Sequence, residues 1–139
     1  MRLRALAALL LAAALSGAGC VHYPTVLEAG GIMMRPDKGR VVRQPEGAAV
    51  YFDLKSTGMY GDVITGVHTT VAKQAQLVSG AGATLGRFRV AGAAVVSFTE
   101  KGPHVVLREL ARPLVPGETI IVTLVLEKIG GLGIIATVE

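Results

Sequence analysis

Apolar and polar residues alternate with a period of two along most of the chain from residue 47 onward. The clearest run is ETIIVTLVLEK at residues 118–128. Its even-numbered positions from Ile120 to Leu126 are all apolar and lie on one face of an extended chain, whereas Ile121, Thr123, Val125 and Glu127 lie on the other. We therefore predict a strand here that buries its even-numbered face.

Similar runs predict further strands, and Gly-rich or Pro-containing turns separate them. They are GRVVRQP (39–45, closed by Pro45), GAAVYFDLK (47–55), DVITGVHTTVAKQAQLV (62–78, one or two strands broken near Gly66), GRFRV (86–90), AAVVSFT (93–99), HVVLREL (104–110) and IGGLGIIATVE (129–139). No segment shows a helical period. Short strands at this spacing predict an all-β fold, an antiparallel Greek-key sandwich of the cupredoxin or immunoglobulin type.

The first nineteen residues form a separate segment, with basic MRLR followed by the apolar run ALAALLLAAALSGA. The run is too short for a membrane-spanning helix and is typical of an export signal. It ends in LSGAGC, which resembles a bacterial lipobox and places the lipid on Cys20, the only cysteine. The alternative is ordinary cleavage after Ala18, which leaves a free exported thiol. We expect a protein anchored on the extracytoplasmic face of a bacterial membrane, in the periplasm or at the cell surface.

Residues 21–46 contain three of the six prolines and show no clear period. This composition suits a tether between the lipid and a folded domain. We therefore expect a signal peptide at 1–19, a tether at 20–39 and one β-sandwich domain at 40–139.

Charge and composition exclude several functions. The chain carries 14 Lys and Arg against 10 Asp and Glu, and removal of Arg2 and Arg4 with the signal leaves 12 against 10, a net charge of +2. No basic cluster remains that would follow a phosphate backbone, so nucleic acid is not an expected partner. Scattered carboxylates and the lack of a nucleophile–base motif argue against an enzyme.

The remaining candidate chemistry is metal binding. Imidazole and thioether side chains form the ligand set that Cu(I) prefers, whereas zinc needs more His, Cys or carboxylate ligands close together. The mature part holds six such side chains: His22, His68, His104, Met33, Met34 and Met59. Each of them alone also has a structural explanation, as a tether, core or surface residue.

Four stretches of the chain resemble the PCu(A)C family of periplasmic copper chaperones. They are GAAVYFDLKSTGMYGDVITGV, TTVAKQAQLV, VAGAAVVSFTEKGPHVVLREL and LVPGETIIVTLVLEKIGGLGIIATV. The Gly-Pro-His-Val-x-Leu segment around His104 is the most specific element. The resemblance implies a cupredoxin-like sandwich that carries Cu(I) on His and Met side chains and delivers it to a copper-receiving protein such as cytochrome oxidase.

The family pattern joins an early His, a Met-bearing loop and a late His-x-Met. By resemblance, His104 is the late His, Val78 stands at the early His and Val106 at the late Met, while the loop SGAGATLG (79–86) has no Met. A valine has no lone pair for Cu(I), which needs two to four converging soft ligands. Two hypotheses remain open: a weak or altered Cu(I) site on His104, with Met59 as a substitute ligand, or a non-metal binding or structural lipoprotein that kept only the sandwich.

Overall fold

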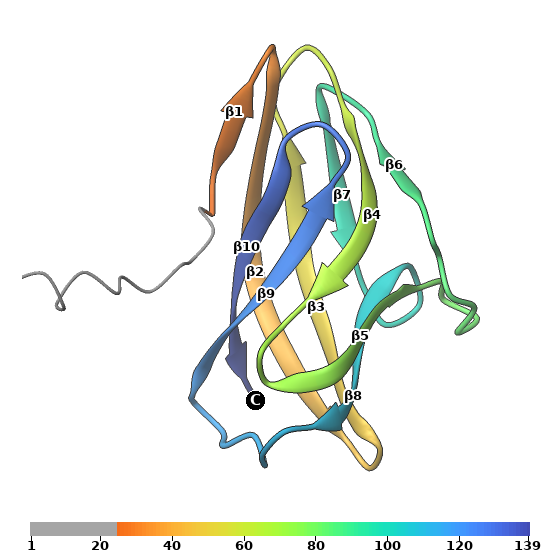
Figure 1. Cartoon of the computed structure of the whole chain (residues 1–139), viewed down its shortest axis with the longest axis vertical. Helices are drawn as coiled ribbons and strands as arrows, with labels where there is room; N and C mark the ends of the chain where they lie inside the picture. Colours follow the sequence, from red (N-terminus) through yellow and green to blue (C-terminus); the bar gives the residue numbers. More distant parts are fainter. Residues whose placement is uncertain (1–24) are drawn as a thin grey trace, which may run out of the picture.

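A computed structural model describes residues 25–139 of the protein, and this part of the chain is all β (Figure 1). Its strands are β1 (Leu27–Ala29), β2 (Ile32–Gln44), β3 (Gly47–Ser56), β4 (Asp62–His68), β5 (Ala72–Val78), β6 (Phe88–Val90), β7 (Ala94–Phe98), β8 (His104–Leu110), β9 (Thr119–Leu126) and β10 (Gly130–Val138). Within this part of the chain, no helix has the length and apolar character needed to cross a membrane.

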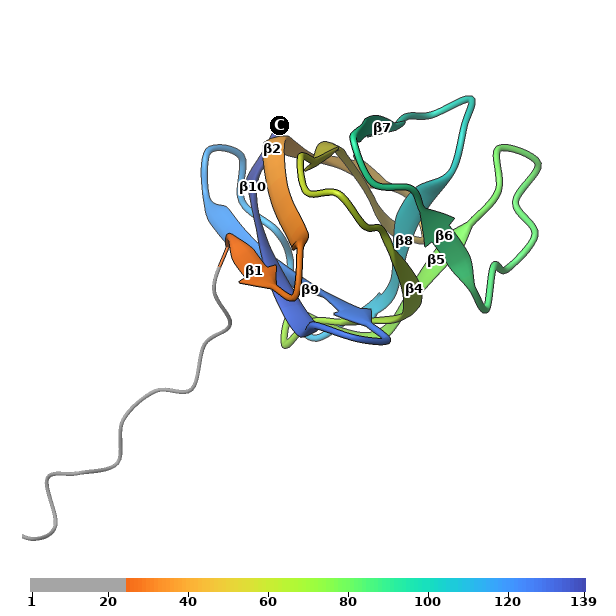
Figure 2. The ribbon, with the colours of Figure 1, turned by 90° about the horizontal axis from the view of Figure 1, so that it is seen from above.

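The strands form one continuous sheet that curls into a sandwich, as the view along the strands shows (Figure 2). Their order is β5-β8-β3-β2-β10-β9-β4-β6, with β1 added to β2 and β7 added to β3. The predicted all-β Greek-key sandwich is confirmed. One pair, β2 with β10, is parallel, and it joins the beginning and the end of the domain.

The core follows the alternation in the sequence. On β9, Ile120 and Leu126 are no more than 3% exposed, whereas Ile121 and Val125 are 45% and 40% exposed, so the predicted faces of this strand are confirmed. Thr123 is buried although it lies on the outer face. The sandwich has its own core and complete strand pairing within residues 27–138, as an independently folding domain requires.

The domain begins earlier than the sequence pattern predicts. The expected tether at 20–39 is wrong from Leu27 onward, because β1 and β2 occupy residues 27–44. The alternation is hidden by Pro36 and by a bulge between Asp37 and Arg40, where Lys38 has a φ of 54°. Residues 35–38 lie between the segments of β2 that pair with β1 and with β10, so a proline costs no hydrogen bond on that edge. The expected signal peptide and lipidated Cys20 lie outside the described residues.

The prediction that residues 62–78 are interrupted near Gly66 is wrong in its position. Two strands do form, but the chain turns between His68 and Ala72. Gly66 instead lies at a bulge within β4, facing Val125 of β9. A glycine inside a strand is thus associated here with a bulge and not with the end of the strand.

Candidate metal centre

His104 is the first residue of β8 and follows a tight turn at residues 99–103. The turn is closed by a hydrogen bond of 3.0 Å from the Thr99 amide to the Pro103 carbonyl. The Nδ1 atom of His104 lies 2.9 Å from the Gly102 carbonyl oxygen. Because a carbonyl oxygen only accepts, Nδ1 carries the proton and donates it. This leaves the lone pair of Nε2 free, as in histidines that bind metal through one nitrogen and are oriented through the other.

The side chains nearest to His104 are mostly apolar. Val78 of β5 is its direct cross-strand partner and is only 3% exposed. Val106 lies two residues further along the same face of β8, between Gln76 of β5 and Ala49 of β3. Thus the positions assigned to the early His and the late Met by resemblance flank His104 in space. Both hold hydrocarbon side chains, so neither can bind a metal.

Tyr51 forms a further wall of this site. Its ring lies 5.5 Å from the His104 ring, centre to centre, with the planes tilted by 58°. Burial raises the pKa of the Tyr51 phenol above its usual value of 10, and the charge of Glu100 raises it further, against the opposing effect of the Arg40 guanidinium. The phenol therefore stays protonated at neutral pH and does not supply a phenolate ligand. The sequence analysis missed Tyr51, although its place in an aromatic strand was visible.

The loop that corresponds to the family's Met-bearing segment is a compact turn. Ser79 and Ala83 pair through a hydrogen bond of 2.8 Å, and Thr84 forms an isolated bridge to Val78. Gly80 packs so closely against the Lys101 carbonyl that no Cβ fits between them. The loop thus rests on the turn that precedes His104, but it contributes no sulfur or imidazole.

The three methionines within residues 25–139 do not come near His104. In the pairing of β3 with β8, His104 lies beside Tyr51. Met59 comes after Ser56, the last residue of β3, and Ser56 lies about 17 Å along the strand from Tyr51. Met33 lies at the same far end, where its carbonyl accepts from the Thr57 amide. Met34 is fully buried in the core. Met59 is 78% exposed and does not replace the missing ligand in this arrangement.

His68 is also remote. It ends β4 and lines an open pocket of about 200 Å³ with Thr69, Ala72, Lys73 and Gln74, among others. This pocket lies by Ala72, at the start of β5, whereas His104 pairs with the other end of that strand, six residues and about 20 Å away. Across residues 25–139 there is no group of three or more His, Cys, Asp or Glu side chains that could hold a metal. His22 lies outside the described residues.

Comparison with known families identifies the chain. A family described as "Putative lipoprotein LpqE-like" matches residues 32–138, almost the whole sandwich. The chain belongs to the LpqE-like family. No curated protein matches this LpqE-like chain.

Several solved structures share the fold of this LpqE-like protein. The copper-bound PCuAC domain from PmoF2 has a TM-score of 0.68 and 21% identity, covering 86% of this chain and 98% of that domain. The apo PCuAC domain from PmoF1 has a TM-score of 0.69 and 18% identity, covering 82% and 98%. Cu(I)-bound DR1885 from Deinococcus radiodurans has a TM-score of 0.64 and 23% identity, covering 92% and 85%. The predicted resemblance to PCu(A)C proteins is confirmed at the level of the fold.

Proposed function

We propose that this LpqE-like protein is an exported lipoprotein, anchored through Cys20, that carries Cu(I) on His104 and passes it to a copper-receiving protein such as cytochrome oxidase. Its role is that of a carrier and not of a catalyst. The observation that carries the proposal is the His104 ring, fixed through Nδ1 at 2.9 Å from the Gly102 carbonyl with Nε2 left free. The copper-bound state of two structures with the same fold supports the choice of metal.

A single imidazole makes this a weak and exchangeable site. Cu(I) is a soft ion that prefers several sulfur or nitrogen ligands, and Val78 and Val106 supply none. The open coordination positions then belong to solvent, to a small ligand or to the receiving protein. Weak binding is compatible with transfer, because the receiving protein completes the coordination while His104 dissociates.

A competitive titration of Cu(I) against a chelator tests this function. We expect residues 25–139 to bind one Cu(I) weakly, His104→Ala to abolish that binding and His68→Ala to leave it unchanged. His68 is a matched control because it is the other histidine of the described domain and lies at the opposite end of β5. Equal binding by wild type and His104→Ala would refute the role of His104.

The second candidate is a lipoprotein that kept the sandwich and lost the metal. The two valines that flank His104 favour it, since both ligand positions have become apolar. In that case His104 serves the fold through its bond to Gly102, and its removal lowers stability by about 1 kcal/mol. Failure of wild type to compete for Cu(I), together with such a loss in His104→Ala, would select this function.

A further inference from the structure

Four turns meet at one end of the sandwich, drawn at the top of Figure 1: residues 30–31, 57–61, 91–93 and 127–129. We refer to them together as the tip. The Tyr60 amide donates to the Gly31 carbonyl at 3.1 Å, and the Ala93 amide donates to the Gly58 carbonyl at 2.9 Å. At Gly58 and Gly92 the neighbouring backbone comes so close that no Cβ fits. Three of the four turns, at 30–31, 57–61 and 91–93, are therefore held together by their backbones.

This firmly held tip presents apolar side chains to water. Met59 is 78% exposed and Tyr60 is 57% exposed. Methionine and tyrosine are enriched in the buried parts of interfaces, and a tyrosine ring with its hydroxyl suits a boundary between water and lipid. Their exposure on an ordered turn indicates a surface that is covered when the protein works.

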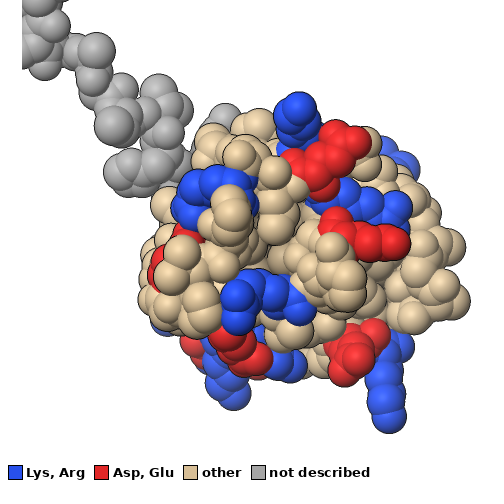
Figure 3. Space-filling model, turned by 90° about the horizontal axis from the view of Figure 1, so that it is seen from below, with Lys and Arg blue, Asp and Glu red and all other residues tan. Residues whose placement is uncertain are grey.

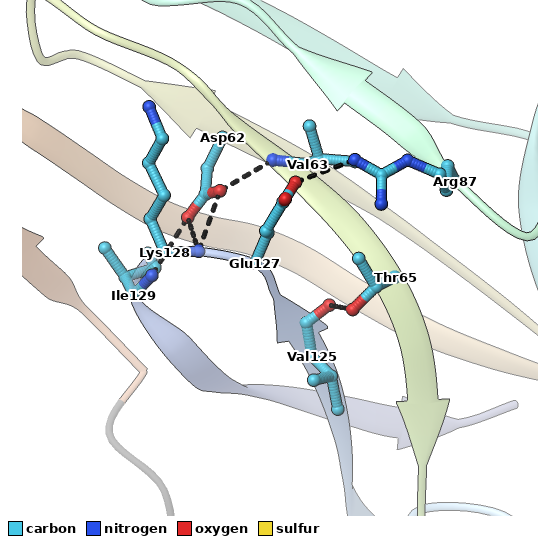
Figure 4. A network of polar contacts seen from close by, with 8 residues as sticks. All are labelled: Asp62, Val63, Thr65, Arg87, Val125, Glu127, Lys128 and Ile129. Carbon is cyan, nitrogen blue, oxygen red and sulfur yellow. Dashed lines mark hydrogen bonds and ion pairs between the residues drawn. The ribbon is translucent and has the colours of Figure 1, made fainter.

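Next to Tyr60 lies an open pocket of about 230 Å³ whose charged lining is Asp62, Arg89 and Lys128. Asp62 as a whole is only 3% exposed, and its carboxylate accepts from the backbone amides of Val63, Lys128 and Ile129 (Figure 4). Its charge is therefore directed to buried amides, whereas the Arg89 and Lys128 side chains are exposed at the surface. Within residues 25–139, neither Arg89 nor Lys128 forms an ion pair.

The opposite end of the molecule carries two ion pairs. Seen from below, it shows acidic and basic side chains interspersed (Figure 3). Arg112 and Glu118, in the connection between β8 and β9, pair at 2.7 Å, and Arg40 pairs with Glu139 at the C-terminus at 3.4 Å. At the tip, Arg89 and Lys128 lie outside these ion pairs and beside the exposed Met59 and Tyr60, a combination that complements an anionic surface.

The length of the anchor brings such a surface within reach. Leu27 of β1 follows Cys20 by only seven positions, so a lipid on Cys20 lies within about 25 Å of that strand. This step rests on the lipidation contained in the proposed function. We infer that the tip docks on the anionic phospholipid surface of the bilayer that holds the anchor. Met59 and Tyr60 then sit among the headgroups, and Arg89 and Lys128 contact lipid phosphates.

Vesicle binding by residues 25–139, which lack the anchor, tests the docking apart from lipidation. The probes are vesicles of phosphatidylcholine alone and of phosphatidylcholine with phosphatidylglycerol in equal parts, with sedimentation as readout. We expect binding to the anionic vesicles at low salt, reduced roughly 25-fold by Arg89→Gln with Lys128→Gln, because each cation near such a surface contributes about fivefold. Met59→Ser with Tyr60→Ser also weakens binding, and it preserves the charge.

The matched control is Lys73→Gln with Lys101→Gln, which removes the same charge from other surface positions on β5 and the turn before β8. It is expected to retain most of the binding. Equal loss in both charge variants, or no binding by wild type, overturns the proposal. Displacement of the protein from the vesicles by inorganic phosphate at matched ionic strength would indicate a pocket for free anions. Self-association that buries Met59 would indicate that a second copy covers the tip. Either result also overturns the docking proposal. Copper binding and N-terminal mass spectrometry test the proposed function independently of these outcomes.

Discussion

Replacing Asp62 by Asn should destabilise the domain more than any surface charge change. Asp62 begins β4, and its two oxygens accept hydrogen bonds of 2.8–3.2 Å from the amides of Val63, Lys128 and Ile129. The carboxylate thus ties β4 to the turn between β9 and β10, which are distant in sequence (Figure 4).

The size of the effect follows from these contacts. A hydrogen bond to a charged group contributes about 1.5–3 kcal/mol, and an amide left without an acceptor costs a similar amount. Asn keeps one acceptor oxygen and turns an NH₂ group toward at least one backbone N–H. We therefore expect a loss of about 2–4 kcal/mol, a large part of the roughly 5–15 kcal/mol that stabilise a typical domain. For a domain of this size, the melting temperature should fall by roughly 10–20 °C.

Urea unfolding at neutral pH, followed by circular dichroism because the chain has no Trp, measures this loss. Glu127→Gln is the matched control, because this substitution also removes one negative charge close to Asp62. The Glu127 carboxylate forms only an exposed ion pair of 2.8 Å with Arg87. We expect the control to change stability by less than about 1 kcal/mol. Equal losses in the two variants would refute the assigned role of the Asp62 bonds.

Three further predictions concern packing and pH. Phe98→Ala should cost about 3–5 kcal/mol in urea unfolding, because the ring is 1% exposed and stacks on Phe52 at 4.4 Å; a loss below about 1 kcal/mol would contradict this. Gly80→Ala should shift the His104 imidazole signals in NMR spectra, since the added Cβ displaces the loop from the turn before His104; unchanged signals would show that the two are not coupled. Arg112 and the Val115 amide lower the pKa of Glu118 below 4.5, so its contribution to stability is present above pH 4.5 and is lost as the pH falls through the lowered value. Glu118→Gln should accordingly be less stable than wild type at neutral pH, with a difference that shrinks in acid; a difference that does not depend on pH would contradict it.

The strands were predictable where one face is buried and the other solvated. β9 and β10 show this, because apolar residues occupy every second position of each strand and these core-facing residues are almost completely buried. The start of the domain was not predictable. The bulge at Asp37–Arg40 shifts which side chains point to the core, and proline, present here as Pro36, is rare in strands. The parallel pairing of β10 with β2 depends on two ends of the chain and leaves no local signal.

The candidate site was partly predictable. The placement of Val78 relative to His104 came from family resemblance, and the register of β5 with β8 places the two side by side. The position of Met59 could not be read from the sequence, because it depends on where the turn after β3 lies relative to the turn before β8. The same holds for the bond from His104 to Gly102, which depends on the shape of that turn.

We propose that His104 is an oriented Cu(I) ligand in an incomplete site, in which Val106 stands in place of a sulfur ligand. The Cu(I) affinity of Val106→Met, measured by chelator competition beside wild type and the double variant with His104→Ala, tests it most directly. We expect Val106→Met to bind Cu(I) at least about tenfold more tightly than wild type, a gain of about 1.4 kcal/mol, and the removal of His104 to abolish this gain. An affinity equal to that of wild type, or a gain that survives without His104, would contradict it.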